Sequence, residues 1–221
     1  YLNEFFIIKH ENGYLIDCSE NSTTEVIKNL SKYKLMSNVN IKDLSSKLVT
    51  GIIHHEKFKD LQKEIKLNSN TIYFRGSPVY SDPRNKALGA RITTNLEKLY
   101  LVIKKLNLKI VEDKNYYLHA YKLGIPEKGL KNLENQLFGL EANFERLHAI
   151  DFKKGCFIGQ ENTARMRLKN KLRRKLFPIA SSENLSVGDD LTYKNIKIGK
   201  ILIAKPHPFG LIKMFDPNFD E

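Results

Sequence analysis

Cysteine is scarce in this sequence. Cys18 and Cys156 are the only two among 221 residues, with no CxxC motif and no Cys/His pair at zinc-site spacing. Two distant cysteines do not make the disulfide framework of a small secreted domain. The adjacent pair His54 and His55 has no neighbouring cysteine and no histidine one helical turn away, so we interpret it as surface or strand residues. We therefore expect a reducing, cytoplasm-like compartment.

Long apolar runs are also missing. No stretch approaches the 18 apolar residues that a membrane-spanning helix needs, so we expect no membrane partner. The first eight residues, YLNEFFII, lack the basic segment of a secretion signal and are typical of a strand. Apolar residues make up 41% and charged residues 28% of the chain, which is typical of an ordinary globular protein.

Short apolar runs between turn residues predict the fold. Asn12-Gly13 between residues 5–9 and 14–18 predicts a hairpin, because its turn needs residues that tolerate positive φ. Strands followed by helices without regular alternation favour an α+β fold with an antiparallel sheet, and closely spaced C-terminal strands suit a small β-barrel. The expected strands are 38–44 and 48–54, joined by a hairpin near Ser45, then 71–74, 88–93, 176–180, 189–193, 197–204 and 210–215, and the expected helices are 20–35, 94–106 and 112–123.

The densest group of reactive residues lies at 151–161, DFKKGCFIGQE. Gly155 and Gly159 bracket Cys156 on a sharp turn, and helix-forming residues follow Gly159. A helix N-terminus with Lys153 and Lys154 beside it favours the thiolate over the thiol. Cys156 is thus a candidate nucleophile or metal ligand, and the alternative is a buried structural cysteine.

Four segments together resemble a known family. Residues 154–161, KGCFIGQE, are similar to the K-G-C-[FY]-x-G-Q-E signature of the YgfZ family, which includes the CAF17-type iron–sulfur assembly factors and is related to the glycine-cleavage T-protein, an aminomethyltransferase. Residues 82–91 resemble that family's D-P-R-x-x-x-L-G-x-R segment. Residues 124–126 resemble its G-I-P turn, and residues 141–144 resemble its E-x-N-L lead into the signature.

The resemblance implies an architecture and a function. It implies a T-protein-like folate-binding lobe over residues 1–171, expected to lack the family's opening segment, and a C-terminal β-barrel over 172–221. It further implies a folate-binding accessory protein for assembly or repair of iron–sulfur clusters in client enzymes, tRNA-modifying enzymes among them, located in the cytoplasm, or in the mitochondrial matrix of a eukaryote. Its expected partners are iron–sulfur client or carrier proteins, and its expected ligand is tetrahydrofolate or a derivative. The residues expected to contact the folate are Lys154, Gly155, Gly159, Gln160, Glu161 and Arg165.

Cys156 would act in this function as a transient iron or cluster ligand, or as a nucleophile. Two cysteines cannot close a four-thiolate cluster site in one chain, so we expect no resident metal. An alternative is a folate-dependent aminomethyltransferase. Against a stand-alone transferase, Ala120 occupies a position that is often arginine in relatives, Leu123 precedes the G-I-P turn without the carboxylate of the T-protein, and no general base is evident.

The charge balance favours anionic partners. Lys and Arg number 37 against 25 Asp and Glu, a formal net charge of +12, which polyglutamyl folate, RNA or an acidic protein could each match. No acidic residue occurs from Asn162 to Ser182, a stretch with seven cations. A second alternative is therefore an RNA- or tRNA-binding module. We favour a solvated helix end followed by a charged edge strand, because the run lacks aromatic residues for base stacking.

Overall fold

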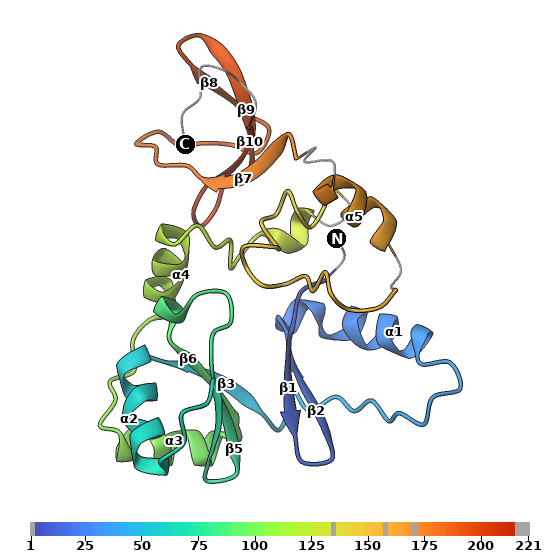
Figure 1. Ribbon diagram of the computed structural model, residues 1–221. Coiled ribbons are helices and arrows are strands. Elements are labelled where there is room, and N and C mark those ends of the chain that lie inside the picture. Colours follow the sequence, from blue (N-terminus) through green and yellow to red (C-terminus); the bar gives the residue numbers. More distant parts are fainter. Residues whose placement is uncertain (1–2, 134–135, 157–158, 169–171, 215–221) are drawn as a thin grey trace. The chain divides into compact units, whose positions relative to one another are not determined.

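The computed structural model describes residues 3–133, 136–156, 159–168 and 172–214 (Figure 1). Its contacts divide the chain into two compact units, Asn3–Val111 and the residues from Glu112 onward. The predicted boundary at 171/172 falls beside residues 169–171, which lie outside the described residues, so that boundary stays a prediction. In the described part of the chain, no helix combines the length and the apolar character that crossing a membrane requires.

A four-stranded antiparallel sheet forms the centre of the first unit. Its strand order is β3 (Val49–Ile53), β6 (Ala90–Thr94), β5 (Ser77–Ser81), β4 (Thr71–Phe74). The strand pairs are all antiparallel, as the predicted α+β fold requires.

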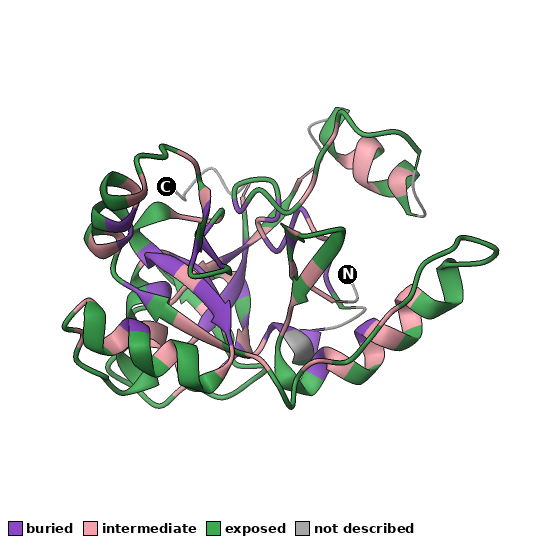
Figure 2. Cartoon of the chain, turned by 90° about the horizontal axis from the view of Figure 1, so that it is seen from below, coloured by how far each residue is buried: buried purple, intermediate pink, exposed green. Residues whose placement is uncertain are grey.

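One face of this sheet carries the hydrophobic core of the first unit. The register pairs place Ile53 opposite Ala90 and Val79 opposite Ile92, so their side chains share one face. Helices α2 (His55–Ile65) and α3 (Leu96–Lys105) cover it. Figure 2 shows buried residues concentrated in these strands. The helices contribute Phe58, Leu61 and Val102 to the core.

A hairpin covers the opposite face of the sheet. Strands β1 (Phe6–His10) and β2 (Gly13–Asp17) pair around the predicted Asn12-Gly13 turn, which confirms that prediction. The Tyr73 hydroxyl of β4 donates to the Lys9 carbonyl of β1. A 3₁₀ turn, η1 (Glu20–Ser22), and helix α1 (Thr23–Tyr33) follow, as predicted for residues 20–35.

The second unit combines short helices with another antiparallel sheet. Its helical elements are α4 (Asp113–Lys122), the 3₁₀ turn η3 (Leu130–Leu133) and α5 (Gln160–Leu168). The sheet order is β7 (Arg174–Pro178), β10 (Phe209–Lys213), β9 (Ile196–Ile203), β8 (Asp190–Tyr193), which confirms four predicted strands. Within the described residues β7 and β8 do not pair, so this sheet stays open. Its four short strands are also fewer than the five of a small OB-type barrel.

Three local predictions differ from the structure. Residues 38–44 form no strand, because the Asp43 carboxylate accepts from the Ser45 amide in a local turn and Val39 stays half exposed. Helix α2 and strand β5 were not predicted. The strand predicted at 88–93 begins only at Ala90, as β6, because residues 86–88 form a 3₁₀ turn.

Candidate functional site

The predicted reactive turn is exposed and leads into a helix. Cys156 is an exposed free thiol, and α5 begins at Gln160, four residues later. Gly159 has φ of 85°, a left-handed conformation that favours glycine. The space around Gly155 is open, because a Cβ added there would meet no atom within 4 Å among the described residues. Residues 157 and 158 of the signature lie outside the described residues. The arrangement rules out a buried structural Cys156 and leaves its chemical role a prediction.

The charged residues of α5 are paired with each other at the surface. Arg165 Nη2 lies 2.5 Å from Glu161 Oε1, one helical turn away, and both side chains are more than half exposed. An exposed pair of this kind contributes about 0–1 kcal/mol. Arg165 can therefore exchange its carboxylate partner for a ligand anion at little energetic cost.

The signature segment is anchored on its N-terminal side. The Asp151 carboxylate accepts from the Lys153 amide at 2.8 Å, closing a local turn before the signature. Arg167 of α5 pairs with Glu145 at 3.0 Å, and its guanidinium lies 3.8 Å from the centroid of the Phe152 ring. Helix α5 buries none of its residues, so Arg167 is a main contact between this helix and the preceding segment.

The E-x-N-F segment that precedes the signature is bound to strand β7. The Glu141 carboxylate is 5% exposed and accepts from Arg174 Nε at 2.9 Å and from the Phe138 amide at 3.2 Å. Asn143 has φ of 62° and donates its side-chain amide to the Leu176 carbonyl at 2.6 Å. These contacts give the segment a structural role, because they position the chain that carries the signature.

The ion pairs of these arginines also bear on the basic stretch from Asn162 to Ser182. Arg165, Arg167 and Arg174 each have a carboxylate partner, whereas residues 169–171 lie outside the described residues. Strand β7 is an edge strand, as the sequence interpretation of this run expected. The edge position of β7 and the pairing of its Arg174 with the nearly buried Glu141 agree with that interpretation.

The G-I-P turn ends α4 as the sequence predicted. Gly124 has φ of 71°, and a side chain there would meet the Arg146 guanidinium at 2.8 Å. Arg146 Nη2 donates to the Leu123 carbonyl at 2.9 Å. Ala120 is fully buried. The turn is therefore a packed helix end, and Ala120 is one of the buried residues of the core.

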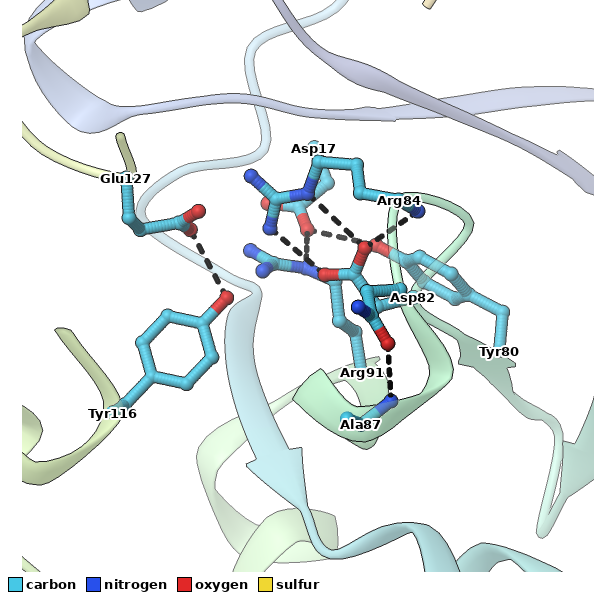
Figure 3. A network of polar contacts seen from close by, with 9 residues as sticks. Asp17, Tyr80, Asp82, Arg84, Ala87, Arg91, Tyr116 and Glu127 are labelled. Carbon is cyan, nitrogen blue, oxygen red and sulfur yellow. Dashed lines mark hydrogen bonds and ion pairs between the residues drawn. The ribbon is translucent and has the colours of Figure 1, made fainter. Parts of the chain in front are cut away.

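The D-P-R segment forms a buried ion pair after β5. Arg84 donates from Nε and Nη2 to the two carboxylate oxygens of Asp82 at 3.0 and 2.8 Å (Figure 3), and their side chains are 9% and 1% exposed. The 3₁₀ turn η2 (Lys86–Leu88) follows and ends at Gly89, φ 91°. A Cβ at Gly89 would lie 2.2 Å from the Ile53 carbonyl oxygen, so the close approach of β6 to β3 requires glycine there.

A second buried pair joins the hairpin to the sheet. Asp17 of β2 accepts from Arg91 Nε at 2.9 Å and from the Tyr80 hydroxyl at 2.7 Å (Figure 3). Tyr80 and Arg91 are cross-strand partners on the face that the hairpin covers. The Phe6 ring lies under both guanidiniums, 4.9 Å from that of Arg84 and 4.6 Å from that of Arg91. This buried network holds the hairpin against the sheet.

The network also fixes the protonation state of its phenol. Burial, and then the Asp17 charge, raise the pKa of Tyr80 well above its ordinary value. Tyr80 therefore donates a hydrogen bond at neutral pH and cannot serve as a base. Sequence reasoning missed Asp17 and Tyr80. Only the position of Tyr80, two residues before the D-P-R segment, could have drawn attention to it.

The described part of the chain shows no preformed metal centre. Its His, Cys, Asp and Glu side chains do not come together in any group of three or more that could hold a metal ion.

Comparisons with known proteins agree with the motifs. No protein-family model matches the chain. It is 27% identical over 188 residues to the mitochondrial iron-sulfur cluster assembly factor IBA57 homolog of Dictyostelium discoideum, covering 81% of this chain and 45% of that protein. It is 27% identical over 171 residues to human IBA57, covering 76% and 45%, respectively. It is 26% identical over 210 residues to the tRNA-modifying protein YgfZ of Buchnera aphidicola, covering 86% and 62%.

These relatives confirm the resemblance that the motifs predicted. The chain spans about half the length of the curated relatives it matches.

Proposed function

Because the homologues of this chain are IBA57 and YgfZ proteins, we propose that it is an accessory protein for iron–sulfur cluster assembly that uses the Cys156 thiol. The observation that carries the proposal is the exposed Cys156 within KGCFIGQE, on the turn that precedes α5. An exposed thiol near a helix N-terminus is accessible to iron, to sulfur species and to a partner protein.

The cluster would be cargo, and Cys156 would be one of its transient ligands. Iron–sulfur clusters are held by thiolates, and most need four of them. Cys18 belongs to the other unit and contacts the Thr23 hydroxyl at 3.7 Å. The remaining ligands would therefore come from a carrier or client protein, or from glutathione. This requirement makes a partner part of the proposed function.

A reduced folate is the ligand that we propose beside this thiol. Lys154, Gln160 and Arg165 present cationic and amide groups on one exposed segment, and these suit the carboxylates of a glutamate tail. Gly155 and Gly159 leave the backbone open to close approach. A pteridine ring prefers a concave and mostly apolar surface, so the signature segment would hold the tail of the folate and not its ring. The bound folate would supply a reduced pteridine able to exchange one-carbon units.

The proposed location follows from the relatives. Several carry the word mitochondrial in their names. We propose the mitochondrial matrix for this chain if its source is a eukaryote, and the cytoplasm otherwise.

The proposal can be tested by complementation. A host that lacks its own YgfZ-type protein would express the chain, a Cys156→Ala variant or a Cys18→Ala control, and the activity of an iron–sulfur enzyme would be measured in extracts. The unmodified chain and the control should restore the activity, and Cys156→Ala should not. Full restoration by Cys156→Ala, at equal protein level, would remove the thiol from the function.

Folate binding needs a separate measurement. Tetrahydrofolate with a polyglutamate tail, titrated into the chain by calorimetry, should bind more tightly than the monoglutamate. Arg165→Gln should reduce this difference, whereas Lys197→Gln, an exposed control on β9 paired with Asp190, should not. Equal affinity for the two tail lengths would contradict the assignment of the tail to this segment.

A further inference from the structure

A hollow of about 550 Å³ opens on the second unit, and none of its lining residues belongs to the signature turn. Its walls come from the end of α4, from the residues after β7 and from those before β10. The residues that matter for its chemistry are Tyr121, Ile179, Ser181, Ser182 and His207. The volume lies within the range of about 300–1,000 Å³ of small-molecule sites.

A rigid aromatic platform forms one wall of the hollow. The Tyr121 hydroxyl donates to the Ile179 carbonyl at 2.7 Å. The Tyr121 ring meets the buried Phe209 edge-on at 5.6 Å and stacks with His207 at 4.9 Å, with 23° between the planes. Three contacts thus fix Tyr121, one from the residue after β7 and two from residues 207 and 209, before and at the start of β10. Because His207 is only partly buried, its ring can extend the stack by one more layer.

The described residues that line the hollow are uncharged apart from the titratable imidazole of His207. They include no Lys, Arg, Asp or Glu, although these residues make up 28% of the chain. Burial raises the pKa of Tyr121, so its phenol is neutral at physiological pH. Ser181 Oγ accepts from the Glu183 amide at 3.0 Å, which leaves its hydroxyl hydrogen able to donate. A ligand would therefore meet a flat ring and hydroxyl groups, without an ionic partner.

We propose that this hollow binds a planar, uncharged heteroaromatic ring, which stacks on the His207–Tyr121 pair and turns its polar edge to Ser181 and Ser182. Stacking is tolerant of ring type, so a nucleobase and a pterin share the required chemistry. If the ring is a nucleobase, the inference goes beyond the proposed function; if it is a pterin, it rests on the proposed folate and gives the place of its ring. None of the lining residues belongs to the signature segment and the test does not involve Cys156, so a failure here is distinguishable from a failure of the thiol's role.

The test uses adenosine and pterin as the aromatic probes and cyclohexanecarboxamide as a non-aromatic probe. Each is titrated into the ¹⁵N-labelled full chain, and amide shifts are followed. We expect saturable shifts at residues 179–182 and 207 with at least one aromatic probe and none with the non-aromatic one. The tighter aromatic probe identifies the source of the ring.

Variants then separate stacking from general surface binding. His207→Ala should weaken binding about tenfold or more, as expected for the loss of one stacking partner. Tyr193→Ala, which removes an exposed ring of β8 in the same unit, should leave it unchanged. If His207→Ala fails to fold, the probe affinity of His207→Gln and the amide shift map of the unmodified chain test the proposal in its place. Shifts absent at millimolar probe, equal binding of the non-aromatic probe, or binding unchanged by loss of His207 would each overturn the proposal.

Discussion

Removing the Asp17 carboxylate should destabilise the protein far more than removing an exposed one. The side chains of Asp17 and Arg91 are only 10% and 12% exposed, and the same carboxylate oxygen accepts from Arg91 Nε and the Tyr80 hydroxyl. Asp17→Ala would leave a buried guanidinium without this counter-charge, at a cost of about 3–5 kcal/mol. A typical domain has a free energy of unfolding of about 5–15 kcal/mol, so the loss is a large share of its stability.

Urea unfolding followed by circular dichroism measures this loss as a shift in the midpoint at constant slope. The matched control is Glu64→Ala in the same unit, which removes the partner of Lys105 from a pair whose side chains are 38% and 48% exposed. That change should cost about 0–1 kcal/mol. If Asp17→Ala were no more destabilising than Glu64→Ala, the buried network would not be what holds the hairpin on the sheet.

Three further predictions test other contacts. The raised pKa of Tyr80 means that the folded state holds the phenolic proton more tightly than the unfolded chain does. Its contribution to the free energy of unfolding should therefore be fully present below pH 10.0 and fall above it. In alkaline unfolding titrations Tyr80→Phe should flatten this fall, and parallel curves for the two proteins would refute the assignment. Glu141→Gln should lower the free energy of unfolding by about 1.5–3 kcal/mol, since it weakens charge-assisted bonds from Arg174 at a nearly buried carboxylate; an unchanged melting temperature would contradict this. Iodoacetamide should alkylate the exposed Cys156 before the half-buried Cys18, as peptide mass spectrometry can follow, and equal rates would argue against the displayed thiol.

Local chemistry in the sequence predicted several elements well. The hairpin needed only the Asn12-Gly13 turn between two apolar runs, and β1 and β2 form there. Helix α3 begins where Asn95 accepts from the Lys98 amide at 2.8 Å, as an N-cap residue does. Helix α4 ends before Gly124. In each case a few neighbouring residues determine the structure.

Elements that depend on distant partners were missed. Gly76-Ser77-Pro78 is typical of a break, yet β5 is buried along its whole length between β6 and β4. Pro78 is tolerated in this strand although it cannot donate a ladder bond. Residues 38–44 show weak alternation but find no strand partner in the described sheet. Tertiary pairing, and not local propensity, decided both cases.

The candidate site shows the same difference between features set by neighbouring residues and features set by distant partners. The turn around Cys156 could be recognised because its residues are contiguous. The roles of Arg91 and Glu141 could not, because their partners are distant in the sequence: Arg91 bonds to Asp17, 74 residues away, and Glu141 bonds to Arg174, 33 residues away. These motif residues hold the chain in place and do not form an open binding surface. The sequence resemblance alone did not separate these two kinds of residue.

The most direct test of the proposed function is cluster transfer in a defined mixture. An apo form of an iron–sulfur enzyme would be incubated anaerobically with a cluster-loaded carrier protein and with the unmodified chain, Cys156→Ala or Cys18→Ala, and recovery of enzyme activity would be timed. We predict faster recovery with the unmodified chain and with Cys18→Ala, and no acceleration with Cys156→Ala. Equal acceleration by all three proteins, or by none, would contradict a role for this thiol in iron–sulfur cluster assembly.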